Sequence, residues 1–318
     1  MASDKRIIAV VGATGAQGGG LARAILNDPD SEFAVRAITR NPNKENAKAL
    51  ASKGAEVVQA DLDDPTSVEK AFEGAYGAFC VTNFWEHFSA KKEKEQAKTM
   101  AEAAKKAGLK HVVWSTFEDT RDSIPLSDDR MPTLQGEYKV AHFDAKAEAD
   151  AFFREGGVPT TFLYTSGYYE NFIHFGWGPE RGEDGGFAVV FPLDDVKMPM
   201  IAVEDIGKCA FGIFKRGDEY IGKTVGIAGD HVSGHEMAEA LSDALDLDVS
   251  YVAVPADVYR SFDFPGADDV GNMFQFKRDF NDLYRGNRRL EESRKLNPEL
   301  QSLRDWLASN AGQIPIPD

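Results

Sequence analysis

The sequence predicts an α/β fold with a Rossmann-type, doubly wound parallel sheet and a smaller α+β lobe. Short apolar runs alternate with helical patterns over the first 165 residues, and the glycine-rich segment 12–19 stands at the first strand–helix junction. Strands that alternate with helices form right-handed crossovers and a parallel sheet covered on both faces. After Gly167 the pattern changes, because aromatic residues and glycines become frequent. This change predicts the separate lobe.

Six strands and five helices are expected in the first half of the chain. The strands are predicted at residues 7–11, 33–39, 56–59, 78–81, 111–115 and 160–164. The helices between them are predicted at residues 17–27, 45–52, 65–72, 89–107 and 141–155. The first run, Ile-Ile-Ala-Val-Val, is apolar throughout, which is typical of a central strand that is buried on both faces.

The second half of the chain has weaker local patterns. We predict a hairpin and several separate elements there: strands 187–191 and 196–200 pairing with each other, a helix from Val203, a strand at 225–228, a helix at 234–245 and mostly short helices over 249–318. Ser233 is a good N-cap for its helix, and Glu236 stands three residues later, which is the spacing of a capping box.

These elements predict two domains. Residues 1–166 with 200–230 are expected to form the NAD(P)-binding Rossmann domain, and residues 167–199 with 231–318 the smaller lobe for substrate or partner.

Charge and composition exclude several classes of function. The net charge of −16 repels nucleic acid and anionic membrane at long range. Cys80 and Cys209 are the two cysteines, with no Cys/His cluster near them, so neither a disulfide framework nor a metal site is expected. No run reaches the roughly 20 apolar residues that span a bilayer, and the start lacks a signal-peptide pattern. We expect a cytoplasmic protein, with nuclear entry left open.

The strongest chemical signal is the segment Gly-Ala-Thr-Gly-Ala-Gln-Gly-Gly at residues 12–19. Gly12 permits a tight turn, Gly15 lets the backbone approach a pyrophosphate, and Gly18 allows close packing of helix on sheet. The positive end of the following helix then holds the anion. The alternative is a glycine-rich turn without a ligand, which the position at the first βα junction opposes. The residues expected at the pyrophosphate are Gly12, Thr14, Gly15, Ala16, Gln17 and Gly18.

The end of the second strand favours NADP(H) over NAD(H). An acidic residue there bonds the ribose hydroxyls in NAD-preferring sites, whereas this chain has Arg40 and Lys44. Both can pair with a 2′-phosphate; the alternative is an ordinary basic loop. Asp61 follows the third strand and could bond the adenine. Thr82 and Asn83 follow the fourth strand, where they border the nicotinamide ribose or form a structural turn.

A catalytic centre is harder to identify. Related reductases use a Tyr-x-x-x-Lys pair for proton transfer, and none of the nine tyrosines has a lysine four residues later. His142 and Lys146 stand one helical turn apart and can share a face. Lys146 could hydrogen-bond the nicotinamide ribose or act as acid/base, while His142 could equally be structural. Ser115 ends the fifth strand, where a substrate-orienting serine would sit.

The chain resembles the NmrA-like proteins, atypical members of the short-chain dehydrogenase/reductase superfamily, and most closely their NADPH-sensing members. The segments that carry the resemblance are residues 12–19, 39–42, 54–59, 81–86, 141–146 and 264–267. The resemblance implies that Tyr168, Tyr169, Glu170 and Asn171 line the cofactor together with Gly12 to Gln17, Arg40, Lys44 and Lys146. It also implies that a lysine of the helix after strand four reaches the cofactor, with Lys91, Lys92 and Lys94 as candidates.

Two functions follow. The first is a regulatory NADP(H) redox sensor that acts through a protein partner, either a transcriptional regulator or a metabolic enzyme, without turnover. The alternative is an NADPH-dependent reductase of a small aromatic, quinone or carbonyl substrate, of the isoflavone or quinone reductase kind, with Lys146 as its catalytic residue. The sequence leaves a homodimer open.

Overall fold

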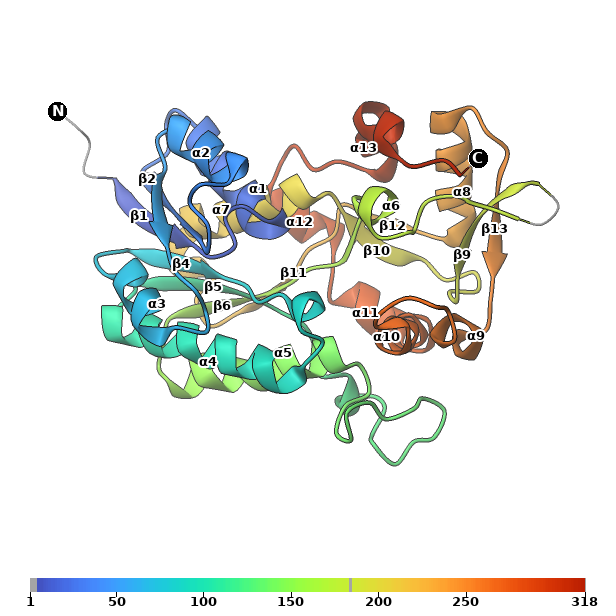
Figure 1. Ribbon diagram of the computed structural model, residues 1–318, viewed down its shortest axis with the longest axis horizontal. Coiled ribbons are helices and arrows are strands. Elements are labelled where there is room, and N and C mark those ends of the chain that lie inside the picture. The colour runs from blue at the N-terminus through green and yellow to red at the C-terminus, as the bar shows by residue number, and fades with distance from the viewer. Residues whose placement is uncertain (1–4, 183–184, 318) are drawn as a thin grey trace. The chain divides into compact units, whose positions relative to one another are not determined.

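The computed structural model describes residues 5–182 and 185–317 (Figure 1). It contains two compact units, each built from three segments. The first unit comprises Met1–Asp119, Ala145–Tyr164 and Glu204–Val225, and the second comprises Thr120–Asp144, Thr165–Val203 and Gly226–Asp318. Residues 120–144, which the sequence analysis grouped with the nucleotide-binding domain, belong to the second unit. Residues 1–4, 183–184 and 318 of the predicted domains lie outside the described residues.

The first unit is organised around a seven-stranded sheet with the order β11-β6-β5-β4-β1-β2-β3. Its strands are β1 (Arg6–Val10), β2 (Phe33–Thr39), β3 (Glu56–Gln59), β4 (Gly77–Cys80), β5 (His111–Thr116), β6 (Thr160–Tyr164) and β11 (Thr224–Gly226). In the order of the sheet, each strand from β6 to β3 pairs in parallel with its neighbour. The six strands predicted for the first half of the chain are therefore confirmed within one or two residues, as is the α/β Rossmann-type fold.

Helices cover both faces of this sheet. They are α1 (Ala16–Asn27), α2 (Glu45–Ser52), α3 (Pro65–Phe72), α4 (Ala90–Ala107), α5 (Ala141–Glu155) and α7 (Val203–Arg216). On one face, α3, α4 and α5 bury their apolar residues against β1, β4 and β5 (Figure 1). On the other, α1 and α7 meet so closely that a Cβ on Gly207 would lie 2.1 Å from the backbone carbon of Gly20. Glycine at position 207 is therefore required by the packing of the two helices.

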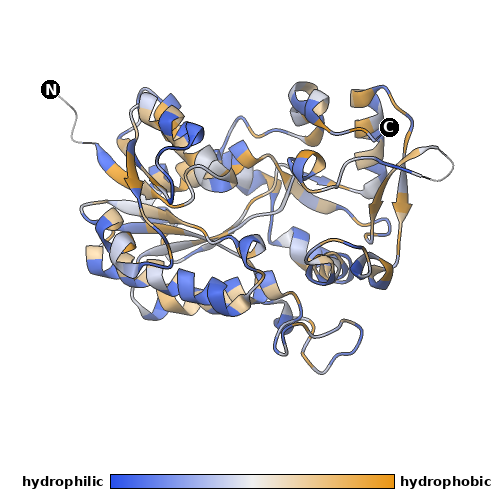
Figure 2. Cartoon of the chain, in the orientation of Figure 1, coloured by the Kyte–Doolittle hydropathy of each residue, from blue (hydrophilic) through white to orange (hydrophobic). Residues whose placement is uncertain are grey.

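Local signals explain where these helices begin and end. Asp64 caps α3 by accepting hydrogen bonds from two backbone N–H groups, and Pro65 occupies the first turn. Ser89 caps α4, and Gly108 ends it in the left-handed conformation. Hydrophilic and hydrophobic residues are mixed along the helices (Figure 2), as expected for helices with one buried and one solvated side.

The second unit contains two three-stranded sheets, with the orders β12-β10-β7 and β13-β9-β8. Their strands are β7 (Gly167–Tyr168), β8 (Glu180–Arg181), β9 (Phe187–Phe191), β10 (Met198–Ile201), β12 (Asp230–Val232) and β13 (Val249–Ala253). The predicted hairpin between residues 187–191 and 196–200 is wrong. β9 pairs with β8 and β13, whereas β10 pairs with β7 and β12. All four residues of β10 are buried, and this strand has neighbours on both of its edges instead of pairing with β9.

The second unit also contains helices. They are α6 (Asn171–His174), α8 (Gly234–Leu245), α9 (Ala256–Arg260), α10 (Ala267–Asp279), α11 (Asn281–Gly286), α12 (Leu290–Leu296) and α13 (Leu303–Asn310). The predicted capping box is confirmed, because the Ser233 side chain accepts from the Glu236 N–H while the Glu236 carboxylate accepts from the Ser233 N–H. Phe274 lies at the centre of an aromatic core with Trp177, Phe191 and Tyr259, at ring-centroid distances of 5.2 to 5.5 Å.

Candidate nucleotide-binding site

The turn between β1 and α1 has the geometry that its glycines predict. Gly12 has a φ of +65°, which strongly favours glycine. A Cβ on Gly18 would lie 2.5 Å from the carbonyl oxygen of Val11 and 2.6 Å from that of Gly12. The Gly15 N–H donates to the Gly12 carbonyl over 2.9 Å, closing the turn. The first helix can therefore start directly against the end of the first strand only with these glycines.

The N-terminus of α1 fits a phosphate group. Gly15 stands at its N-cap, no side chain caps the helix, and the first turn holds no acidic residue. Gly15 and Ala16 are exposed. An uncapped helix start presents backbone N–H groups and a partial positive charge. The residues present therefore fit the pyrophosphate of a dinucleotide.

Arg40, the predicted phosphate ligand, has a carboxylate partner that the sequence analysis missed. Its guanidinium contacts both oxygens of Glu86, with Nη2 3.1 Å from Oε2 and Nη1 closer still to Oε1. The two side chains are 62% and 47% exposed. The Glu86 hydrogen bond raises the pKa of Arg40, and the Arg40 hydrogen bond lowers the pKa of Glu86. Glu86 thus occupies the guanidinium edges that a 2′-phosphate would use.

Four other predicted residues follow the ends of β2, β3 and β4 and differ in their exposure and contacts. Lys44 is exposed and stands at the N-cap of α2. Asp61 is exposed after β3, where its side chain accepts from the Asp63 N–H over 3.0 Å. Asn83 is exposed and precedes a short helical turn. Thr82 is buried and faces the cluster described next.

Lys146 forms a buried ion pair. Its Nζ lies 2.6 Å from Glu93 Oε1 and donates to the Thr82 hydroxyl over 2.5 Å. Lys146 is 6% exposed and Glu93 is fully buried. His87 Nε2 approaches the other Glu93 oxygen at 3.4 Å. Burial alone would raise the pKa of Glu93, but Lys146, His87 and Thr82 together lower it to about 2.

The charged side chain that α4 buries is the acidic residue Glu93 and not a lysine. Lys91, Lys92 and Lys94, the candidates for a cofactor-contacting lysine, pair with Glu95, Asp63 and Glu148 respectively. The position that faces the interior is Glu93, which lies with alanines and Met100 on the buried side of the helix. A charged residue on an otherwise apolar helical stripe was the signal that could have identified Glu93 from sequence.

Ser115 and His142 have different surroundings. Ser115 lies in β5 with its hydroxyl buried, and it has no hydrogen-bond partner within the described part of the chain. Such a group fits a site that is completed by a ligand. In the second unit, the His142 ring contacts the Asp269 carboxylate through Nδ1, and both side chains are about 5% exposed. This contact supports the structural alternative for His142.

The predicted segment 168–171 belongs to the second unit. Tyr169 is fully buried against the Trp306 ring, with centroids 5.7 Å apart. Glu170 accepts from Trp306 Nε1 over 3.1 Å and from the Val203 N–H over 3.0 Å. These contacts give Tyr169 and Glu170 structural roles. Their contact with a cofactor, like that of Tyr168 and Asn171, stays a prediction.

Two further findings concern the described ranges 5–182 and 185–317. They contain no helix of the length and apolarity needed to cross a membrane. They also contain no group of three or more His, Cys, Asp or Glu residues arranged to hold a metal ion.

A glycine turn between the first strand and the first helix of a parallel sheet, with the helix start uncapped, defines a Rossmann-type protein of the dinucleotide-binding class. Comparison with known proteins is more specific. The model of the NmrA-like family matches residues 4–307, so this chain belongs to the NmrA-like family.

Proteins similar to this chain include a named oxidoreductase, a transcriptional regulator and, in fold alone, a reductase. The NmrA-like family domain-containing oxidoreductase FrzB of Cladobotryum sp. is 33% identical over 241 residues, which cover 69% of this chain and 67% of that protein. The structure of NmrA, a negative transcriptional regulator, has a TM-score of 0.77 at 25% identity and covers 96% of this chain and 95% of its own. NmrA has also been solved with NAD and with NADP. The triphenylmethane reductase of Citrobacter sp., solved with NADP(H), shares the fold with a TM-score of 0.72 at 21% identity, covering 96% of this chain and 99% of its own.

Proposed function

We propose that this protein binds NADP(H) in the first unit and acts as a redox sensor that regulates a protein partner. The observation that carries the proposal is the glycine turn with its uncapped helix start, in a unit where Lys146 is engaged in a buried ion pair. The turn supports binding of a dinucleotide. The engagement of Lys146 by Glu93 and Thr82, with no Tyr-x-x-x-Lys in the sequence, supports a role without turnover.

Arg40 supports selectivity for the phosphorylated dinucleotide. A guanidinium can hold a 2′-phosphate through two parallel hydrogen bonds. In this chain the phosphate would first have to displace Glu86 from Arg40, which reduces the advantage of NADP over NAD. We therefore propose a modest preference for NADP(H), which agrees with the capture of both dinucleotides by the similar protein NmrA.

Calorimetric titration with NADPH, NADP⁺, NADH and NAD⁺ tests the cofactor. Arg40→Gln should weaken NADP⁺ binding about tenfold or more, the value of a charged hydrogen-bonded contact, and leave NAD⁺ binding nearly unchanged. The matched control is Arg216→Gln, another arginine of the first unit that pairs with a glutamate, at 3.3 Å. No binding of any of the four nucleotides would contradict the proposal.

The sensor step needs a separate measurement. A regulator must differ in nucleotide affinity between two states or in partner affinity between nucleotide forms. Affinity capture with NADPH-loaded and NADP⁺-loaded protein, followed by titration of the purified partner, should give at least a severalfold difference. Equal partner affinity for the two loaded forms and the nucleotide-free form would refute the sensor.

A reductase is the second candidate, favoured by the relatives that are named oxidoreductases. When bound, NADPH would supply hydride, and Lys146 would give a proton to the substrate oxygen. The test is NADPH consumption with quinones, enals and carbonyl compounds. The double variant Lys146→Met/Glu93→Gln removes both charges together and avoids an unpaired buried charge. Turnover that this variant loses while it still binds NADPH would support the reductase, and no consumption across the panel would exclude it.

A further inference from the structure

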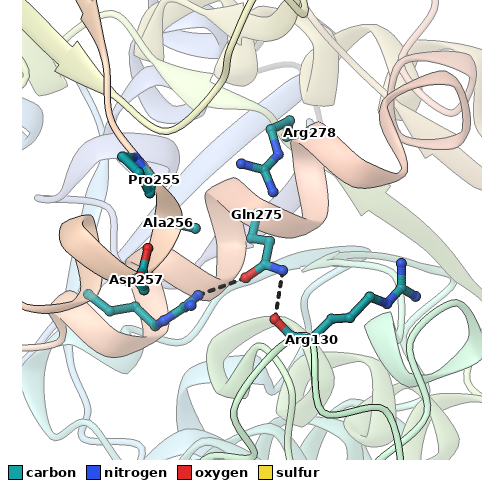
Figure 3. A pocket seen from close by; sticks show the side chains of 7 residues that line it. Arg130, Pro255, Ala256, Asp257, Gln275 and Arg278 are labelled. Carbon is teal, nitrogen blue, oxygen red and sulfur yellow. Dashed lines mark hydrogen bonds between the residues drawn. The ribbon is translucent and has the colours of Figure 1, made fainter.

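The second unit has a basic pocket that the proposed function does not use. Its volume is about 350 Å³, and its lining includes Arg260 from α9, Arg278 and Gln275 from α10, and Arg130 (Figure 3). Asp257 is the one acidic side chain of that lining. Three arginines around one pocket are notable in a chain whose net charge is −16.

Arg260 is held in place by buried amides. Its Nη1 donates to Gln275 Oε1 over 2.7 Å and to Asn272 Oδ1 over 3.3 Å. Both amides are nearly inaccessible to solvent, at 5% and 0% exposure. Their NH₂ groups donate to the backbone: Gln275 to Arg130 O over 2.9 Å and Asn272 to Lys139 O over 2.5 Å. These bonds fix the amide oxygens toward the guanidinium.

The aliphatic part of the Arg260 side chain packs against a glycine. Gly271 of α10 lies beside it, and a Cβ at that position would be 2.4 Å from Arg260 Cγ. Glycine in a helix interior is less favourable than alanine. The glycine and the two amides together position one guanidinium at the pocket.

The charge of Arg260 has no carboxylate partner among residues 5–182 and 185–317. Within these residues its side chain donates to the two amide oxygens, both times from Nη1, so the edge formed by Nε and Nη2 keeps its donors. Burial has the largest effect on the pKa of Arg260 and lowers it; Asp257 raises it, and Arg278, with the smallest effect of the three, lowers it. In contrast, Arg130 pairs with Asp128 at 2.6 Å and Arg278 with Asp279 at 2.9 Å.

We infer that this pocket binds a small organic oxyanion, a carboxylate or phosphate of metabolite size, on the free edge of Arg260. Two parallel N–H donors match the two oxygens of such a group. Arg278 and Arg130, each paired with an aspartate, belong to the same lining, which leaves Arg260 as the arginine with an available edge. A volume of about 350 Å³ lies within the range of small-ligand sites. The anion would compensate the charge that Gln275 and Asn272 cannot neutralise.

Titration of the full-length protein with orthophosphate and with citrate tests this inference. At least one probe should bind with 1:1 stoichiometry. Arg260→Gln should weaken that binding about tenfold or more. Arg260→Lys, which keeps the charge and loses the fork, should weaken it severalfold. Arg289→Gln is the control, because Arg289 is an exposed arginine of the same unit. Circular dichroism should show that all three variants are folded.

A second arm separates this pocket from the glycine turn, which could also hold an anion. The same titrations are repeated with NADP⁺ present. Binding that persists with NADP⁺ and falls in Arg260→Gln supports the pocket. Binding that NADP⁺ abolishes and Arg260→Gln leaves unchanged assigns the anion to the glycine turn and overturns the inference, as does no binding of either probe. Because the Arg260 variants are also measured without nucleotide, a failure of NADP⁺ binding would not affect this result.

Discussion

Replacing Glu93 by glutamine keeps the shape of the side chain and removes its charge from a place that solvent does not reach. Lys146 would lose the carboxylate oxygen that lies 2.6 Å from its Nζ. The remaining hydrogen-bond partners of Lys146 would be the hydroxyl and carbonyl of Thr82. An ammonium that is 6% exposed would then be buried without a counter-ion.

The magnitude follows from the pKa of Glu93. Its fall from an ordinary 4.5 to about 2, at about 1.4 kcal/mol per pKa unit, corresponds to about 3 kcal/mol of stability. Breaking a buried ion pair by removing one partner costs roughly 3–5 kcal/mol, which agrees. Because the pKa is lower in the folded state, this contribution is present above pH 4.5 and is lost as the pH falls toward 2.

Urea unfolding followed by circular dichroism measures the effect. At pH 7 we expect Glu93→Gln to lower the free energy of unfolding by about 3 kcal/mol. The matched control is Glu95→Gln on the same helix, whose pair with Lys91 is 3.8 Å long and exposed; it should change stability by at most about 1 kcal/mol. Wild type should approach the variant in stability between pH 4.5 and pH 3. A Glu93→Gln protein as stable at pH 7 as Glu95→Gln would refute the reasoning.

Three further substitutions and one control have defined outcomes. Glu86→Gln should free Arg40 and raise NADP⁺ affinity severalfold relative to NAD⁺ in calorimetry; an equal change for both nucleotides would argue against competition by Glu86. Gly18→Ala should abolish nucleotide binding and lower the melting temperature, because its Cβ would meet a backbone oxygen at 2.5 Å. Gly286→Ala, in open space, should stay within about 1 kcal/mol of wild type. Burial raises the pKa of Asp150 from 3.8 to about 6, so the contribution of this group to stability should fall as pH rises from about 4 to 6. At about 1.4 kcal/mol per pKa unit, Asp150→Asn should gain about 3 kcal/mol at pH 8 and lose this slope; an unchanged pH profile would exclude that assignment.

The first unit could be predicted from sequence because its signals are local. Each parallel strand is a short apolar run, and each helix has a cap or a periodic apolar face within its own residues. The glycine turn was predictable for the same reason, since Gly12, Gly15 and Gly18 act on backbone within a few residues of themselves.

The unpredicted features depend on partners that are distant in the sequence. β9 pairs with β13, about sixty residues later, and no local pattern distinguishes this pairing from a hairpin with β10. Glu86 and Arg40 are 46 residues apart. Lys146 meets Glu93 from another helix. Long-range pairs of this kind determine which basic side chains stay available to a ligand, so the charges of the site were harder to predict than its backbone.

The two candidate functions place opposite demands on the pair of Lys146 and Glu93. A reductase would need Lys146 to transfer its proton, which would leave the fully buried Glu93 carboxylate facing a neutral amine. The loss of a charged partner inside the protein is strongly unfavourable, and it would have to be repeated in every turnover. A sensor needs only a stable pocket, which an intact ion pair provides. His87, 3.4 Å from the second Glu93 oxygen and 12% exposed in its side chain, is the neighbour through which a reductase could compensate that charge. The low pKa of Glu93 therefore supports the proposed sensor over the proposed reductase.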